Sequence, residues 1–266
     1  MKNMTAADIM QELVEGGMYI QLKTKERQLE QIRNVVKEEL INSEVKRHEF
    51  KKQGLVAKFV PKKVSRIDTT ALNTYLDDLG YLKKVVELDH SLLKDNLFMA
   101  EQLMDYKVPG DCTVVPYFNK IGKQLLKSTD TISEGTIKEH LLNFNMINKE
   151  YKQLEEKYES VKLEMQSCSL LKEHRKLSYK YGSVIIKENK PKYENEEIFK
   201  DFGSGVLIEY GKPNTEKLND LMLNGSIKKS DLEQFKHIEN VRLDFVIMSL
   251  DDEDKLRNAW MSKRIG

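Results

Sequence analysis

The heptad pattern at Ile147–Cys168 restricts the fold of this chain more than any other feature of its sequence. Apolar residues recur there at alternating steps of four and three, which places them along one side of an α-helix. The members of this seam are Ile147, Tyr151, Leu154, Tyr158, Val161, Met165 and Cys168. Thr136 followed by Glu139 is a capping-box pattern that predicts where the helix begins. A helix running on to Tyr181 needs a long coiled coil, within the chain or between copies, to cover the seam.

Composition and patterning favour helix elsewhere as well. Of the 266 residues, only five are proline and 13 are glycine. Residues 18–53 are charged and helix-favouring, and another helix is expected from Asp68, an N-cap residue, to a stop at Gly80. The predicted fold class is therefore mainly α with small β-hairpins (α+β), built on long coiled-coil helices. The same seam, Ile147–Met165, predicts a homo-oligomer interface.

Two segments are predicted to form basic β-hairpins, at 54–67 and 182–193. In GLVAKFVPKKVSRID, two apolar runs flank Pro61-Lys62-Lys63, and in SVIIKENKPKYEN a Lys-Pro-Lys turn follows Gly182. Further on, LNTYLDDLGYLKK resembles LNDLMLNGSIKK, which favours an internal duplication of a helix–hairpin–helix repeat over chance similarity between helix-rich segments. The predicted domains are residues 1–135 and 136–266, the second ending in a strand and a helix.

Positive charge gathers at the two predicted hairpins. The whole chain carries 44 basic and 43 acidic residues, but residues 43–66 hold eight basic residues against two acids and residues 170–192 hold seven against two. Helix C-termini and exposed strand edges account for two or three lysines in each segment. The excess indicates an anionic partner, either nucleic-acid phosphates or an acidic protein face, with a merely solvated surface as the alternative. The candidate binding residues are Lys58, Lys62, Lys63, Arg66, Lys187, Lys190, Lys192, Tyr181 and Tyr193, the tyrosines as stacking groups.

Signatures of catalysis are weak. Residues 75–78 read YLDD and residues 201–203 read DFG, but neither is accompanied by the other motifs that polymerase or kinase chemistry needs. The sequence has no P-loop and no HExxH motif, and its five histidines stand at no ligand spacing. Cys112 and Cys168 are isolated, which is typical of buried thiols in a reducing compartment. We expect no enzyme, no cofactor and no metal.

The N-terminal segment lacks the apolar core of a signal peptide, and no apolar run is long enough to span a membrane. The sequence therefore predicts a cytoplasmic protein with no membrane partner.

One family resemblance involves the first predicted hairpin. A long heptad helix, a short hairpin such as GLVAKFVPKKVS, and Arg66-Ile67-Asp68 before another helix resemble a siphophage-type coiled-coil accessory family associated with phage resistance or host-nuclease inhibition. The resemblance covers about residues 20–85, with an echo at 145–200. It implies a phage or prophage accessory protein acting in a bacterial host cell, and it implies no catalytic residues.

Three hypotheses follow. The first is a non-enzymatic interaction protein that oligomerises through coiled coils and binds or blocks a host protein, in an anti-defence or nuclease-inhibitor role. The second is a nucleic-acid-binding protein that uses both basic hairpins. The third is an enzyme whose site is assembled across an oligomer interface.

Overall fold

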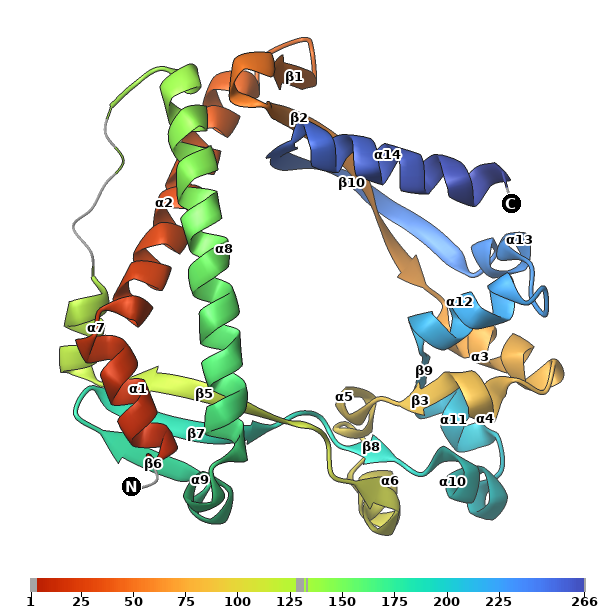
Figure 1. Ribbon diagram of the computed structural model, residues 1–266. Helices are drawn as coiled ribbons and strands as arrows, with labels where there is room; N and C mark the ends of the chain where they lie inside the picture. Colours follow the sequence, from red (N-terminus) through yellow and green to blue (C-terminus); the bar gives the residue numbers. More distant parts are fainter. Residues whose placement is uncertain (1–3, 128–131, 133, 266) are drawn as a thin grey trace. The chain divides into compact units, whose positions relative to one another are not determined.

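The computed structural model describes residues 4–127, 132 and 134–265, and the chain forms two compact units (Figure 1). Unit 1 contains Met1–Lys62, Thr113–Lys187 and Leu243–Gly266, and unit 2 contains Lys63–Cys112 and Glu188–Arg242. The chain therefore passes between the units four times. This division differs from the predicted domains 1–135 and 136–266, because long strands rather than a single linker carry the chain from one unit to the other.

Three helices organise unit 1. α1 (Ala6–Glu15) and α8 (Ile137–Ser167) both begin with a complete capping box, so the box predicted from Thr136 and Glu139 is confirmed. α2 (Met18–Leu40) begins after Gly17, whose positive φ of 76° suits glycine. α2 and α8 lie side by side (Figure 1). The other helical elements are η1 (Lys51–Gln53), α7 (Lys120–Leu126), α9 (Ser169–His174) and α14 (Leu250–Ile265).

The prediction of a long coiled coil is wrong. α8 ends after 31 residues, because Cys168 leaves the helical conformation with a ψ of 119°, well before Tyr181. Its neighbour α2 has only 23 residues. The predicted seam faces its own chain, but two different groups of elements cover it. Ile147 and Tyr151 pack against a core cluster of α2, β2 and β10, and Tyr158, Val161 and Met165 against one of α1 and the β5–β7–β6 sheet, with half-buried Leu154 between them.

The fold class also needs correction, because about 58% of the described residues are helical and 23% lie in strands, which is an α+β fold with more sheet than the predicted mainly α, coiled-coil architecture. The described residues form four small antiparallel sheets, in the orders β1–β2–β10, β5–β7–β6, β3–β9 and β4–β8. The strands of the two three-stranded sheets are β1 (Arg47–Phe50), β2 (Leu55–Ile67), β10 (Lys236–Ser249), β5 (Cys112–Phe118), β7 (Gly182–Glu188) and β6 (Lys176–Tyr179). The strands of the two-stranded sheets are β3 (Val86–Leu88), β9 (Gly211–Pro213), β4 (Lys107–Val108) and β8 (Lys192–Tyr193).

The first predicted hairpin does not exist, because residues 55–67 form the single strand β2. The turn lies earlier, between β1 and β2, where Gly54 adopts a positive φ of 65°. Pro61 is accommodated because its nitrogen lies on an unpaired edge. The Phe59 N–H donates at 2.8 Å to the carbonyl of Lys46, the residue just before β1 begins. The Pro61 nitrogen points to the same side of β2 as the Phe59 nitrogen, and β1 no longer lies opposite it there.

The second predicted hairpin does not exist either. β7 pairs with β6 across a turn at residues 180–181, and β8 belongs to another sheet, where it pairs with β4. Gly54 and Gly182 nevertheless share a local role, because each stands where the second strand of a hairpin begins. Of the two basic segments, Pro61-Lys62-Lys63 lies inside β2, and Lys190-Pro191-Lys192 follows β7 and enters β8.

Unit 2 surrounds the small β3–β9 sheet with short helices, which Figure 1 shows gathered around it. The helix predicted from Asp68 to Gly80 is confirmed as α3, since Asp68 caps the Ala71 N–H at 3.0 Å. The buried Asn73 side chain on α3 donates to the carbonyls of Leu207, Ile208 and Gly211 and so holds the chain that enters β9. The helices are α3 (Thr69–Asp78), α4 (Leu82–Val85), α5 (His90–Leu93), α6 (Leu97–Gln102), η2 (Met104–Tyr106), α10 (Asn195–Phe202), α11 (Gly205–Tyr210), α12 (Thr215–Leu223) and α13 (Lys229–Glu233).

Candidate anion-binding pocket

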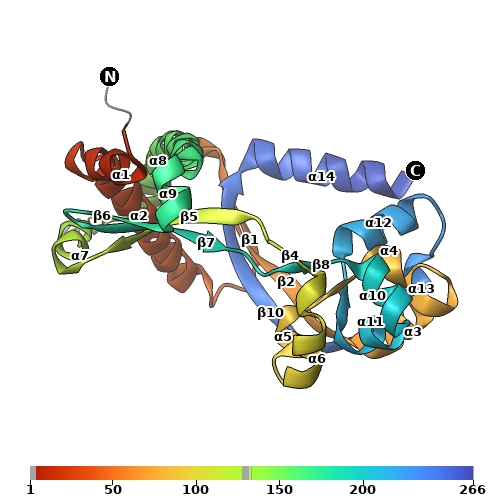
Figure 2. The same cartoon turned by 90° about the horizontal axis from the view of Figure 1, so that it is seen from below.

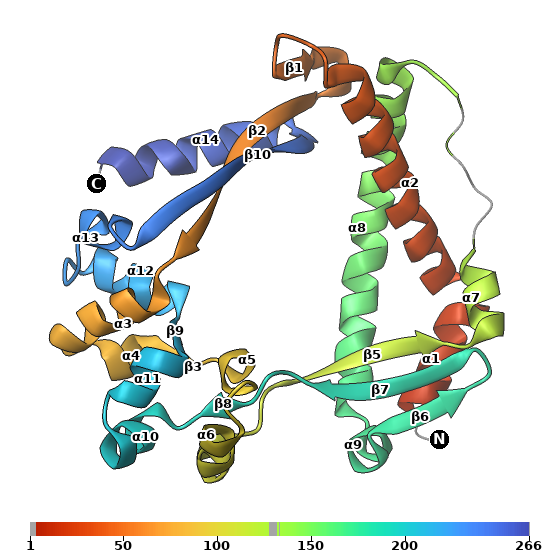
Figure 3. The same ribbon diagram turned by 180° about the vertical axis from the view of Figure 1, so that it is seen from behind.

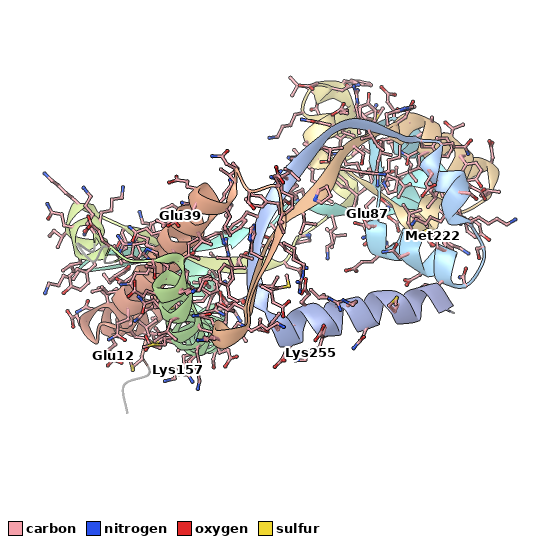
Figure 4. All side chains as sticks on the ribbon, turned by 90° about the horizontal axis from the view of Figure 1, so that it is seen from above. Glu12, Glu39, Glu87, Lys157, Met222 and Lys255 are labelled. Carbon is pink, nitrogen blue, oxygen red and sulfur yellow. The ribbon has the colours of Figure 1, made fainter. Side chains whose placement is uncertain are left out.

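Unit 2 contains a pocket of about 490 Å³ beside its two small sheets. Segments far apart in the sequence form it: the end of β3, the chain entering β8, β9 and the start of α12. Figure 4 labels Glu87, which belongs to its wall. The lining residues are Glu87, Leu88, Asp89, His90, Lys190, Pro191, Lys192, Tyr193, Asn195, Lys212, Pro213, Asn214 and Lys217. Four of them are lysines, so the charges decide what the pocket can bind.

The pairing of β3 with β9 positions Lys212. Glu87 stands opposite Lys212 in this antiparallel pair, and Leu88 stands opposite Gly211. A Cβ atom at Gly211 would lie 2.2 Å from the Val86 side chain and 2.3 Å from a backbone carbonyl oxygen of α11. Only glycine permits this approach of the two strands, so the position of Lys212 depends on Gly211.

Asp89 is the charged centre of the pocket. Its side chain, 10% exposed, accepts hydrogen bonds from the Ser91 N–H at 2.8 Å and the Ser91 hydroxyl at 2.5 Å. It also pairs with Lys212, and more loosely with Lys190 at 3.6 Å. Burial of the carboxylate raises its pKa, but the hydrogen bonds from Lys212 and Ser91 outweigh that effect and hold the pKa far below the ordinary range. Asp89 therefore stays ionised and fixes Lys212.

Glu87 and the start of α12 position Lys217. The Glu87 carboxylate accepts from the Lys217 ammonium at 2.8 Å and from the Asn214 side-chain amide at 3.0 Å. Partial burial opposes ionisation of Glu87, but these two hydrogen bonds lower its pKa overall. Asn214 is at the same time the N-cap of α12, so the helix start and the lysine are positioned together.

Lys190 and Lys192 are held more loosely. Their side chains are 71% and 66% exposed, and Lys192 pairs with the exposed Asp111 at 3.4 Å. The chain that carries them is well defined, because the Asn189 N–H donates to the Asp111 carbonyl at 2.9 Å. A Cβ atom at Gly110 would lie 2.6 Å from the Lys190 carbonyl oxygen, so glycine is needed there for the two segments to approach. The backbone is anchored, and the two ammonium groups make only these long or solvent-exposed pairs.

A histidine–tyrosine pair borders the same pocket. The Tyr193 hydroxyl lies 3.1 Å from His90 Nδ1, and burial raises the pKa of Tyr193. Tyr193 is therefore a neutral, buried hydroxyl group that orients His90. It is not an exposed ring on which a base could stack.

The pocket brings together three of the residues predicted from sequence, Lys190, Lys192 and Tyr193. The other six lie elsewhere. Lys58 pairs with Glu253 at 2.6 Å and Lys62 with Asp244 at 3.9 Å, both in unit 1. Tyr181 is buried there and its hydroxyl group reaches Glu15 at 3.3 Å. Lys63 and Arg66 are exposed on the part of β2 that belongs to unit 2, and Lys187 is exposed at the end of β7.

Sequence reasoning missed Lys212, Lys217 and Asp89. A signal for the first was present, because Lys-Pro occurs both at 190–191 and at 212–213, and both lysines line the pocket. In the sequence, Asp89 stands out only as part of a polar cluster with Glu87 and His90, which is typical of a solvated helix face, and its role depends on the pairing of β3 with β9.

Comparison with known proteins found no matching family model, no similar curated protein and no similar solved structure. In the described part of the chain, no three histidine, cysteine, aspartate or glutamate side chains gather as metal ligands would. Among the helices described, none has both the length and the apolar character that crossing a bilayer requires.

Proposed function

We propose that this protein is a binding protein for a phosphate-bearing ligand, which it holds in the lysine-lined pocket of unit 2. The observation that carries the proposal is the convergence of four lysines, from the chain entering β8, from β9 and from α12, on one pocket of about 490 Å³. This volume lies within the range of about 300–1,000 Å³ that is usual for small-ligand sites. A role in blocking a host protein, as the phage-type resemblance implies, stays a prediction.

The four lysines divide into a closely paired set and a loosely paired set. Lys212 and Lys217 are each held by a carboxylate of the pocket wall and contribute to the local potential. Lys190 and Lys192 have only long or solvent-exposed pairs, and exposed pairs of this kind contribute about 0–1 kcal/mol. A phosphate dianion offers both ammonium groups stronger, charge-assisted hydrogen bonds. We expect the ligand to draw these two side chains onto its phosphate group.

Pyrophosphate is a suitable probe, titrated by calorimetry into the full-length protein at low salt. We expect Lys190→Ser/Lys192→Ser to weaken binding by about tenfold or more, since charged hydrogen bonds contribute about 1.5–3 kcal/mol each. The matched control is Lys51→Ser/Lys52→Ser, which removes two exposed lysines of unit 1 and should leave the affinity unchanged. Melting curves should be the same for both variants and the wild type, because these side chains are exposed.

Wild-type protein that takes up no pyrophosphate at millimolar concentration would refute the proposal. The same holds if the unit 2 variant and the unit 1 control lose affinity equally, because binding would then follow net charge rather than the pocket.

A further inference from the structure

The β5–β7–β6 sheet of unit 1 has one covered face and one open face. The side chains of Val114, Val184 and Leu177 point to the covered face, where they pack with α1 and the end of α8. Figure 1 shows these helices in front of the sheet, and Figure 3 shows the opposite face turned to the viewer. Because side chains alternate along a strand, the residues next to these three line the open face.

The open face is basic and carries an exposed tyrosine. The β6–β7 register places Lys176 opposite Ile185 and Ser178 opposite Ser183 on this face. Lys187 follows on β7, and Tyr117 of β5 is 50% exposed. None of the outward positions of the three strands, from 113 to 117, 176 to 178 and 183 to 187, is acidic.

Helix α7 extends the same basic surface. It follows β5 directly, and Gly122 lets it lie against the β6–β7 turn, since a Cβ atom there would be 2.3 Å from the Tyr181 carbonyl oxygen. Figure 2 places α7 at the end of strands β6 and β7. Its exposed lysines are Lys120, Lys123 and, just after it, Lys127. The segment from residue 112 to 127 contains no Asp or Glu, although 43 of the 266 residues of the chain are acidic.

We infer that this open face and α7 form a binding surface for single-stranded nucleic acid. Charge complementarity requires a polyanion, because five lysines border the surface and its outward positions carry no carboxylate. Tyr117 supplies a flat ring on the same face as the partly exposed aliphatic side chain of Ile185, and every nucleic-acid base can stack on such a ring. Three strands span about 10 Å across, at ~4.8 Å between neighbours, which suits an extended single strand better than a compact anion. The inference concerns unit 1 and is independent of the pocket in unit 2.

The test is fluorescence anisotropy with a labelled 20-nucleotide oligo-dT at 50 mM NaCl. We expect Tyr117→Ser to weaken binding at least fivefold, because base–aromatic stacking contributes about 1–3 kcal/mol per base. Lys120→Ser/Lys123→Ser/Lys127→Ser should lower the slope of log K against log salt by about 2, since each phosphate contact to a single strand contributes ~0.7. Phe98→Ser, at an exposed ring of unit 2, is the matched control and should leave affinity unchanged.

Three results would overturn the inference. The first is a wild-type protein that does not bind the oligonucleotide, and the second is a Tyr117→Ser variant with wild-type affinity and an unchanged melting curve. The third is competition by polyglutamate as strong as by unlabelled oligo-dT, which would assign the surface to an acidic protein. Lys190→Ser/Lys192→Ser should bind the oligonucleotide normally, so failure here and failure of the pyrophosphate pocket are separate outcomes.

Discussion

The carboxylate of Glu253 is expected to anchor α14 to the β1–β2 hairpin of unit 1. Its side chain is only 8% exposed and accepts from the Arg47 guanidinium at 2.5 Å and the Lys58 ammonium at 2.6 Å. The hydrogen bond from Arg47, followed by that from Lys58, lowers the pKa of Glu253 from 4.5 to about 2. Glu253→Gln removes the charge while keeping the size of the side chain.

The pKa shift sets an upper limit on the effect. At about 1.36 kcal/mol per pKa unit, this shift corresponds to about 3 kcal/mol of stability if it is fully transmitted to folding. Arg47 is 41% exposed, so solvent screens part of the attraction, and we expect a loss of about 1–2 kcal/mol at pH 7. Because the folded pKa is depressed, this stability is present above pH 4.5 and is lost as the pH falls through about 2.

Urea unfolding followed by circular dichroism, at pH values between 7 and 2.5, measures this effect. The difference between wild type and Glu253→Gln should be largest near pH 7 and shrink steadily below pH 4.5. Asp254→Asn is the matched control, because the next carboxylate on α14 is 65% exposed and its removal should cost less than ~0.5 kcal/mol. A Glu253→Gln protein as stable as the wild type at pH 7, or a difference that does not change with pH, would refute the reasoning.

Two further predictions concern the backbone that supports the pocket of unit 2. Gly211→Ala should destabilise the protein by at least ~1–3 kcal/mol in urea unfolding, because the new methyl group would overlap the Val86 side chain, whereas Gly205→Ala meets nothing within 4 Å and should be neutral. Asn73→Ala should cost about 2–4 kcal/mol, since it removes a buried amide that donates to three carbonyl groups around β9, and Thr74→Ala on the exposed side of α3 is its control. Equal stability within either pair of variants would contradict the packing described for β9.

Local interactions explain what could be predicted from the sequence. The capping box at Thr136, the N-cap at Asp68 and the stop at Gly80 each depend on contacts within a few residues, and each is present in the fold. The heptad seam does lie on the side of α8 that packs against other elements, although only Met165 of the seam is fully buried. The elements that cover the seam could not be predicted. An apolar side of a helix indicates only that it packs against something, and here it packs against helices and strands of the same chain.

The strands show where local sequence stops being sufficient. Pro61-Lys62-Lys63 resembles a turn, but β2 continues through it because β1 does not extend opposite Pro61, so the missing N–H leaves no carbonyl of β1 without a donor. Whether a chain turns or continues at such a point depends on how far the neighbouring strand extends, and that is determined by the tertiary structure.

The candidate pocket divides in the same way. The charge excess identified Lys190 and Lys192 from sequence alone, because neighbouring residues are enough to show it. Lys212 and Asp89 are more than 120 positions apart, and only the pairing of β3 with β9 brings them into contact. Local contacts form within a segment whatever the rest of the chain does. Contacts between distant segments form only when the packing of the whole unit compensates the entropy lost in closing the chain between them. Only the tertiary structure therefore brought these residues together in one pocket.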